Sequence, residues 1–532
     1  MNTPVNENAA ANNKYQAAIE VALVFVVFLV QGAWPVPEVN EPYYLGKAIN
    51  YWSPGWIEND FFLQTADSHA TFYFTFGWLS LLLTPLVLAW FGRVLTWILL
   101  AWSWRRLNLA VLPRPWFSVL SAALFVCMAD RCHMAGEWVF GGLEAKGFAF
   151  VLVFLGMEAL IKNRWNRVWL LLGAASAFHV LVGGWAVVCA GLAWIMLAVC
   201  RRDVDSSEKL PTPMSMLPAL LGGFVLSLPG LLPAAALNVG VHDRVVALAN
   251  HVYVYERLSH HLSPMQIPTQ FIVRFSALVV LAVVIFSLAP RVEALRRLQA
   301  FVIGTMLLAL IGVVIGIIGN WAPEPAAALL RFYWFRLADV IVPLGIAVVG
   351  CACIAEALRE RPPLGRVLLS IGAVIGVLHV GGYAKERLYI TPPRACRMYD
   401  FPAWRHICER IAEDETISPD ALFLTPRMSQ TFKWYAQRPE VVNWKEIPQD
   451  AEAMVEWWRR IEDIHATGES DPLLRWHYTL ARQGPERLKH IGRKYGADYA
   501  VTLNSPRLPL PVVHLNRRYV VYDLREGAGD LP

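Results

Sequence analysis

Residues 34–70 read WPVPEVNEPYYLGKAINYWSPGWIENDFFLQTADSHA and form the first long polar excursion between two strongly apolar segments. Crossing a bilayer takes about 20 apolar residues, so a loop in this position leaves the membrane and returns to it. Two of its acidic residues, Glu41 and Asp60, stand closest to a polar and aromatic set. This set is Asn40, Tyr43, Tyr44, Lys47, Trp52, Trp56 and Asn59. An acidic, aromatic loop of this kind indicates the rim of a catalytic site.

The composition of the whole chain is that of a multi-pass membrane protein. Of the 532 residues, 56% are hydrophobic and only 17% are charged, and long apolar runs follow one another. The net charge of +5 is modest and the arginines are scattered, which argues against nucleic-acid binding. The eight cysteines show no spacing that would indicate a zinc site.

Eleven segments are expected to span the membrane as an all-α bundle. They are 16–34, 86–107, 116–130, 143–162, 166–179, 181–200, 217–238, 270–289, 299–318, 331–357 and 366–383. Segment 69–85 could be a separate short span, but we expect it to be the outer half of a long helix bent at Pro85. A single crossing over 69–107 then places the basic connections on one side of the membrane. This topology predicts a multi-pass membrane protein with its N-terminus inside and its C-terminus outside.

After about residue 384 the composition becomes that of a soluble domain. We therefore expect a transmembrane domain over 1–383 and a small extracytoplasmic α/β domain over 384–532. The expected strands are 421–426, 499–504, 512–515 and 519–524, and the expected helices are 451–464 and 485–495. Cys396 and Cys408 form either a disulfide or two free thiols.

Three further groups of residues lie at the outward ends of the expected spans. DRCHMAGEWVFGGLEAKGFAF (130–150) contains Glu137, Glu144 and Lys146, which could bind sugar hydroxyls, hold a divalent cation, or neutralise one another. ERLSHHLSP (256–264) and RFYWFRLAD (331–339) contribute the residues that suit a phosphate by charge-assisted hydrogen bonds. These are Arg257, His260, His261 and Arg331.

Two pairs of charged residues could have a structural role instead of a catalytic one. Arg336 and Asp339 are three residues apart, so we expect them to pair within their span. Glu41 and Asp60 could be solvated loop charges, with Glu41 paired to Lys47. As a catalytic group, a carboxylate beside a membrane cavity would deprotonate or orient an acceptor hydroxyl.

At these residues the chain resembles the GT-C superfamily, the polytopic glycosyltransferases that use polyprenyl-phosphate-linked sugars. The shared plan is a first span, an outward loop with an acidic residue (NEPYYL, 40–45), a second acidic loop (GEWVFGGLEAKG, 136–147) and an outward C-terminal domain. The chain also resembles a bacterial membrane protein family that carries NEPYYL-, GGLEAKGFA- and RFYWFR-like stretches. The second loop lacks a DxD or ExD motif and the C-terminal domain lacks a WWD-type motif, so Mg²⁺ or Mn²⁺ dependence and a peptide acceptor remain open.

The resemblance implies an inverting sugar transfer from a polyprenyl-phosphate donor to an extracytoplasmic acceptor. In that scheme Glu41 is the general base, and Asp60 supports it or binds the acceptor. Glu137 and Glu144 contact the sugar or a cation, while cationic groups neutralise the departing phosphate. Those groups are Lys146, His260, His261 and Arg331. Glu41, Glu137 and His260 should then line one cavity. A transporter or lipid flippase and a non-catalytic envelope assembly protein are the alternatives.

Overall fold

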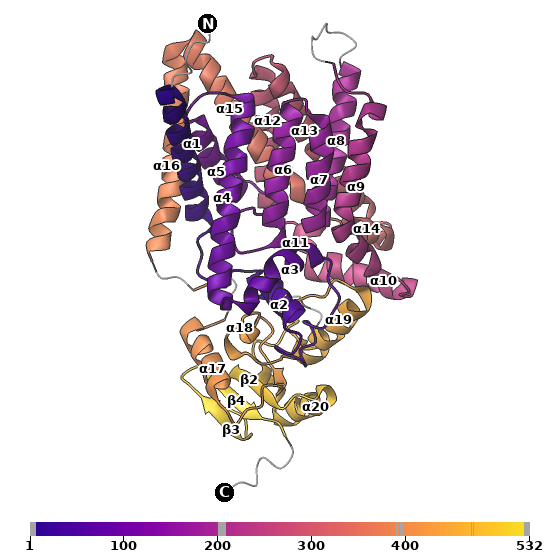
Figure 1. Ribbon diagram of the computed structural model, residues 1–532. Helices are drawn as coiled ribbons and strands as arrows, with labels where there is room; N and C mark the ends of the chain where they lie inside the picture. Colours follow the sequence, from indigo (N-terminus) through magenta and orange to yellow (C-terminus); the bar gives the residue numbers. More distant parts are fainter. Residues whose placement is uncertain are drawn as a thin grey trace.

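A helical bundle carries a small α/β domain at one end (Figure 1). The computed structural model describes residues 7–200, 209–389, 392–393, 398–469, 471 and 473–525. Within these ranges eight helices are long and apolar enough to cross a membrane. They are α1 (Glu7–Gly32), α4 (Pro85–Val111), α8 (Val180–Cys200), α9 (Pro213–Ala236), α12 (Thr269–Leu288), α13 (Glu293–Ile318), α15 (Arg336–Glu360) and α16 (Pro362–Leu388). The fold is that of a multi-pass membrane protein.

Three shorter helices occupy the same bundle and coincide with the remaining expected spans. They are α5 (Phe117–Arg131), α6 (Ala145–Ile161) and α7 (Trp165–Phe178). The backbones of α7 and α9 touch, because a Cβ added to Gly173 would lie 2.1 Å from the carbonyl oxygen of Gly223. Small residues allow such close helix contacts in a bilayer. The full count of eleven spans stays a prediction.

The expected bend at Pro85 is wrong. Residues 70–81 form a short helix α3 (Ala70–Phe76) and a 3₁₀ turn (Gly77–Leu81), and α4 begins at Pro85. Proline is well suited to the first turn of a helix, because the N–H that it lacks has no partner there. In Figure 1, α3 lies beside α2 (Glu41–Trp52) at the end of the bundle that faces the C-terminal domain.

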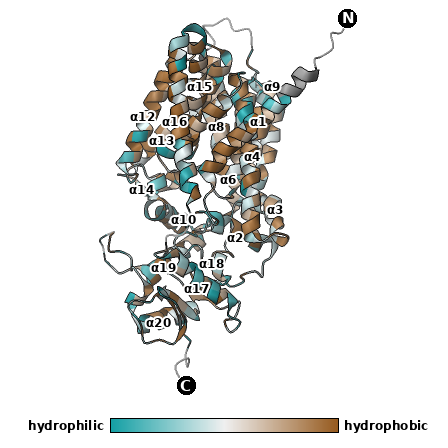
Figure 2. Cartoon of the chain, turned by 90° about the vertical axis from the view of Figure 1, so that its left-hand side faces the viewer, coloured by the Kyte–Doolittle hydropathy of each residue, from teal (hydrophilic) through white to brown (hydrophobic). Residues whose placement is uncertain are grey.

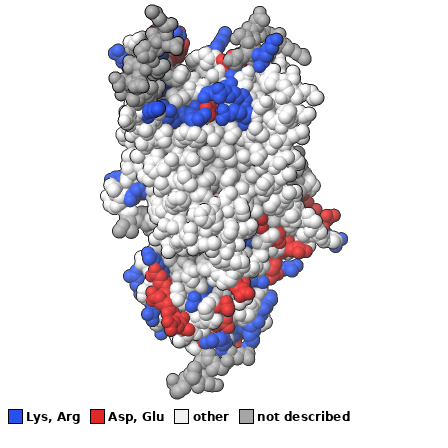
Figure 3. All heavy atoms as spheres, in the orientation of Figure 1, with Lys and Arg blue, Asp and Glu red and all other residues white. Residues whose placement is uncertain are grey.

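The two ends of the molecule differ in charge and hydropathy. Lys and Arg gather at the bundle end away from the C-terminal domain (Figure 3), and apolar residues dominate the bundle between the ends (Figure 2). At the basic end Arg105 pairs with Glu20 at 3.1 Å, and Arg106 pairs with Glu158 at 2.9 Å. This distribution agrees with the positive-inside bias on which the predicted orientation rests.

The C-terminal domain is built on a four-stranded sheet in the order β1-β2-β4-β3. Its strands are β1 (Phe423–Leu424), β2 (Tyr499–Leu503), β3 (Val512–Leu515) and β4 (Tyr519–Asp523); β1 and β2 are parallel and the other pairs antiparallel. Val520 and Tyr522 pack toward α19 (Ala451–His465) and α20 (Pro485–Tyr495). Tyr519 and Val521 face α17 (Phe401–Glu413) and α18 (Phe432–Ala436) on the other side, as the two-residue period of a strand requires.

The expected strands and helices of this domain are therefore present. Cys408 is buried in α17, whereas Cys396 lies outside the described residues.

Short elements connect the bundle to the C-terminal domain. The connection between the expected spans 217–238 and 270–289 is largely helical, with α10 (Asp243–His251), a π-helix (Val252–Arg257) and α11 (Ser259–Leu262). A further short helix, α14 (Pro323–Leu330), precedes the RFYWFR segment. Single π turns occur often at functional sites, and this one places Tyr253 and Arg257 at the wall of a cavity.

Candidate functional site

A cavity of about 610 Å³ lies between the bundle and the C-terminal domain. Its size falls in the range of small-molecule sites. Its polar lining residues are Asn40, Tyr43, Tyr44, Ser68, His69, His179, Asn238, Tyr253, Arg257, Arg331, Tyr333, Arg336, Lys445 and Gln449. An apolar wall comes from α8 and α9 and includes Leu181, Leu231, Ala234, Ala235 and Leu237. One face of the cavity is thus polar and cationic, and the other is apolar.

A carboxylate–imidazole pair stands at the polar face. His69 Nδ1 lies 2.7 Å from Asp67 Oδ1, and Tyr43 donates its hydroxyl to Asp67 Oδ2 at 2.7 Å. Burial alone would raise the pKa of Asp67, but His69, Lys47 and the hydrogen bonds lower it to about 2. Asp67 is therefore an ionised acceptor, which places the proton of neutral His69 on Nδ1 and a lone pair on Nε2. Within the described residues His69 Nε2 has no hydrogen-bond partner.

Arg336 lines the same polar face and is oriented by three neighbours. Its Nε donates to Glu137 Oε2 at 2.6 Å, its Nη1 lies 3.1 Å from His179 Nε2, and its guanidinium stacks 3.8 Å from the Tyr333 ring. Tyr333 has a φ of 54°, a left-handed conformation that costs energy in a bulky residue and is often retained at functional sites.

The second acidic stretch forms an ion-pair chain behind Arg336. Lys146 Nζ lies 2.7 Å from Glu137 Oε1 and 3.3 Å from Glu144 Oε2, and Glu144 accepts from the Asn40 side chain at 3.2 Å. The structure thus brings Glu137, Glu144 and Lys146 together. Arg336 joins this group through its ion pair with Glu137. Arg336 and Lys146 lower the pKa of Glu137, although burial alone would raise it.

The expected pairing of Arg336 with Asp339 is wrong. Asp339 instead accepts from the backbone N–H groups of Met134, Ala135 and Glu137, at 2.7, 2.9 and 3.3 Å. A buried carboxylate can be satisfied by backbone donors as well as by a cation. The result fixes the loop that carries Glu137, while Arg336 is left to face the cavity.

Two further arginines add positive charge to the cavity. Arg331 lines it and hydrogen-bonds the neutral side-chain oxygen of Asn250, and no carboxylate of the described residues pairs with it. Arg257 Nε donates to the carbonyl of Trp444 at 2.8 Å. Lys445 follows in the chain and also lines the cavity. The expected position of Arg331 at a phosphate-binding wall is compatible with this arrangement.

Glu41 lies away from this cavity, in the interior of the bundle. It and Arg93 are both fully buried, and Arg93 donates to the two carboxylate oxygens at 2.7 and 2.6 Å. The same oxygens accept from the backbone N–H groups of Glu38 and Leu143, each at 2.7 Å. The partner is thus Arg93, not Lys47, and four hydrogen bonds occupy the carboxylate.

Asp60 is equally buried, at the seam with the C-terminal domain. Asp60 Oδ2 lies 3.1 Å from Lys433 Nζ and accepts from the backbone N–H of Glu440 at 3.2 Å. Lys433 also pairs with Glu440 at 3.0 Å and with Glu446. Burial, together with the charges of Glu440 and Asp60, raises the pKa of Glu446 to about 8, although Lys433 lowers it. These carboxylates raise the pKa of Lys433, although burial alone would lower it.

The histidines of the ERLSHHLSP stretch (256–264) are separated from the 610 Å³ cavity. His260 is exposed, and its ring lies 4.0 Å from that of His261. His261 Nδ1 contacts the carbonyl of Ala135, and burial lowers the pKa of His261 to about 3. Neither residue lines the cavity. The expected convergence of Glu41, Glu137 and His260 on one cavity is therefore not found.

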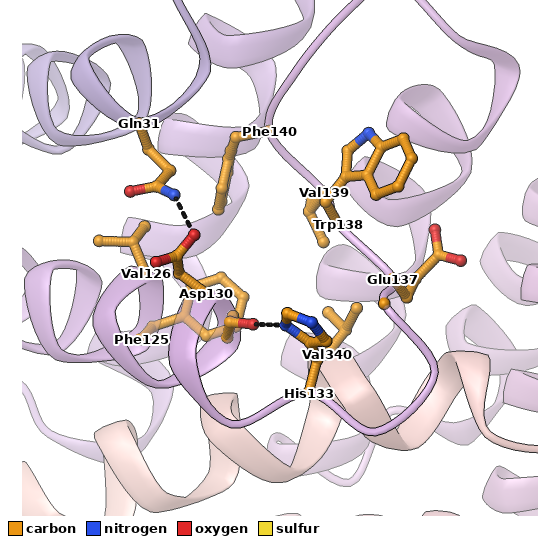
Figure 4. A pocket seen from close by; sticks show the side chains of 12 residues that line it. Gln31, Phe125, Val126, Asp130, His133, Glu137, Trp138, Val139, Phe140 and Val340 are labelled. Carbon is orange, nitrogen blue, oxygen red and sulfur yellow. Dashed lines mark hydrogen bonds between the residues drawn. The ribbon is translucent and has the colours of Figure 1, made fainter. Parts of the chain in front are cut away.

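A second cavity, of about 100 Å³, is lined in part by Glu137, the ion-pair partner of Arg336 (Figure 4). Glu137 borders it together with His133, which contacts the carbonyl of Ala129 at 3.2 Å. Asp130 accepts from Gln31 at 3.3 Å on the far side. The described residues contain no group of three or more His, Cys, Asp or Glu that could hold a metal ion.

The first loop contains the pair that the sequence interpretation missed. Asp67 and His69 stand in TADSHA, at the end of the same stretch that supplied Glu41 and Asp60. The D-x-H spacing directly before an apolar segment was an available signal. The C-terminal contributions, Lys445 and Gln449, carry no such signal because they lie some 380 residues away from the loop.

Comparison with known proteins assigns only part of the chain. Residues 402–464, from α17 into α19, match a family described as a domain of unknown function (DUF6798). No match was found among curated proteins. Two similar solved structures are crystal structures of ArnT from Cupriavidus metallidurans, one bound to undecaprenyl phosphate and one in the apo state. Each is 14% identical and covers 98% of this chain and 99% of its own, with TM-scores of 0.35 and 0.37.

Proposed function

We propose that the protein is an integral-membrane glycosyltransferase that moves a sugar from a polyprenyl-phosphate donor to an extracytoplasmic acceptor, with His69 as the general base. One observation carries the proposal. A carboxylate-oriented imidazole and two arginines, Arg331 and Arg336, face a single 610 Å³ cavity at one end of a membrane bundle. A base and anion-stabilising groups that face the same cavity are what displacement of a phosphate leaving group needs.

The reaction follows from this geometry. His69 Nε2 takes the proton of the acceptor hydroxyl while Asp67 stabilises the imidazolium through Nδ1–H. The acceptor oxygen bonds to the anomeric carbon, and the bond from that carbon to the phosphate oxygen breaks. The electron pair stays on the phosphate, where Arg331 and Arg336 offset the charge. Attack opposite the departing phosphate inverts the anomeric centre.

The apolar wall supports a donor with a lipid chain. Leu231, Ala234 and Leu237 of the α9 region face the cavity, and the neighbouring Leu232 has 62% of its surface exposed on the bundle. An isoprenoid chain held there would keep its phosphate at the cationic wall and its tail in the bilayer. With the basic bundle end in the cytoplasm, the cavity and the C-terminal domain face the extracytoplasmic side of the inner membrane.

The residues expected from the sequence take revised roles in this proposal. The ion-pair chain of Glu137, Glu144 and Lys146 orients Arg336. Glu41 and Asp60 hold the fold, because all their oxygens are already engaged inside the protein. A divalent cation bound to the donor phosphate is compatible with the scheme.

The direct test is His69→Gln in reconstituted vesicles, assayed with a panel of polyprenyl-phosphate hexoses and pentoses. Loss of the base should lower turnover by about 10²- to 10⁴-fold and leave the protein folded. His260→Gln is the matched control, since His260 is exposed and outside the cavity. Undiminished transfer by the His69 variant would refute the proposed base. Lipid translocation without sugar transfer would support a flippase instead.

A further inference from the structure

One side chain of the C-terminal domain reaches the pair in the first loop. Gln449 Oε1 accepts from the backbone N–H of Ser68 at 3.0 Å and from its hydroxyl at 2.7 Å. Gln449 Nε2 donates to the Tyr43 hydroxyl oxygen at 3.0 Å and lies 3.1 Å from His69 Nδ1. A single amide therefore contacts the residues on both sides of Asp67 in space.

These contacts form a directed chain of hydrogen bonds. The Gln449 amide donates to Tyr43, Tyr43 donates to Asp67, and His69 donates to the other oxygen of Asp67. Each donation polarises the next donor in such a chain. Gln449 thus strengthens the Tyr43 bond to Asp67 and makes this carboxylate a weaker acceptor for His69. Its amide hydrogens also disfavour a positive charge on the ring.

The segment that carries Gln449 is fixed at both ends. At its start Asn443 Oδ1 accepts from the N–H groups of Lys445 and Glu446, at 2.9 and 3.0 Å. At its end Asp450 caps α19 by accepting from the N–H of Ala453 at 2.8 Å. The buried cluster around Lys433 ties the same domain to Asp60 of the first loop. Gln449 is thus held at a set position relative to the bundle.

We propose that Gln449 is a positioning residue for the transfer reaction, so that the C-terminal domain completes the active site. The inference rests on the proposed function for its kinetic consequence. Its geometric content is independent of any donor, because the imidazole of His69 responds to its surroundings whether or not substrate is present.

The experiment compares Gln449→Ala with Gln437→Ala in the full-length protein. Gln437 is the matched control, since it is also a C-terminal-domain glutamine that contacts the first loop, through Trp56 at 2.8 Å, but it does not line the cavity. The ¹⁵N signal of His69, assigned by its absence in His69→Gln, is followed across pH. Gln449→Ala should raise the pKa of His69 by roughly half a unit to one unit, the effect of one net hydrogen bond.

Kinetics give the second readout. With a working donor, Gln449→Ala should lower kcat roughly tenfold, leave KM nearly unchanged, and move the pH midpoint of kcat upward with the ¹⁵N titration. Gln449→Glu preserves the size of the side chain and its contacts with Ser68 but cannot donate to Tyr43. It should raise the pKa of His69 further, and it serves where the alanine variant folds poorly.

The outcomes separate the two proposals. An unchanged His69 titration in both Gln449 variants, or an equal shift in Gln437→Ala, overturns the positioning role even if His69→Gln abolishes transfer. A shift confined to the Gln449 variants supports the positioning role even if no donor in the panel is used, in which case the proposed function alone fails.

Discussion

Replacing Glu41 by glutamine should destabilise the protein strongly, because the change leaves Arg93 with a buried charge and no counter-ion. Both side chains are fully buried, and Arg93 makes two bonds to the carboxylate and one to the carbonyl of Trp34. Removing one partner of such a pair costs about 3–5 kcal/mol. At 1.4 kcal/mol per factor of ten, this lowers the folding equilibrium constant by roughly 10²-fold to more than 10³-fold.

The assay is thermal unfolding in detergent, combined with turnover per folded molecule. Glu41→Gln should unfold at a clearly lower temperature and give less folded protein, while the folded fraction keeps most of its activity. His69→Gln should behave in the opposite way, stable and inactive. The double change of Glu41→Leu with Arg93→Met should recover stability relative to either single change, since buried ion pairs are often replaceable by apolar residues of similar volume.

A different pattern would refute this reasoning. If Glu41→Gln unfolds at the wild-type temperature and yet abolishes turnover, the carboxylate acts in the chemistry and the Arg93 pair is not its main role. If the double variant is less stable than both single variants, the contacts described for this pair do not determine its stability.

Three further results are expected. Asp67→Asn should lower turnover by about 10²- to 10⁴-fold without loss of fold, because the amide no longer holds His69 in the tautomer that leaves Nε2 free to accept a proton. A pH–rate profile identical to that of the wild type would count against this role of Asp67. Arg331→Met should weaken binding of polyprenyl phosphate about tenfold, whereas Arg244→Met, at an exposed position, should not; equal losses would indicate a nonspecific charge effect. The pKa of Glu446 is raised to about 8, so the folded protein keeps a proton that the unfolded chain releases. The free energy of unfolding should therefore fall as pH rises from the ordinary carboxyl value of 4.5 to about 8, and then level off. Glu446→Gln should flatten this slope in unfolding curves measured from pH 5 to 9.

The sequence predicted the helices well because its signal was simple. Each expected span coincides with a helix, since a run of apolar residues in a bilayer has few alternatives to helical structure. The expected C-terminal strands and helices also appear, because alternating and amphipathic patterns mark them. Segment 69–85 was misread because its apolar aromatic residues pack into a short helix beneath the bundle, a tertiary contact that composition does not encode.

The site was harder to predict because an acidic residue at a membrane boundary can either take part in catalysis or form a buried ion pair that stabilises the fold. Glu41 and Asp60 drew attention as costly charges, and the structure gives each a buried cation, Arg93 and Lys433, at separations of 52 and more than 370 residues. Spacing along one loop cannot reveal such partners. For His69, in contrast, the sequence pattern did not show that residues of the C-terminal domain lie beside it in the folded protein.

The Lys433 cluster also constrains how the molecule is made. Asp60 emerges early in synthesis, whereas Lys433, which neutralises it, belongs to the last third of the chain and follows the last of the described membrane-length helices. Until then the first loop cannot bury its acidic group at acceptable cost. Completion of the cavity should therefore be the final event of biogenesis. A nascent chain stalled before residue 433 should contain an inserted bundle whose cavity lacks the wall formed by the C-terminal domain.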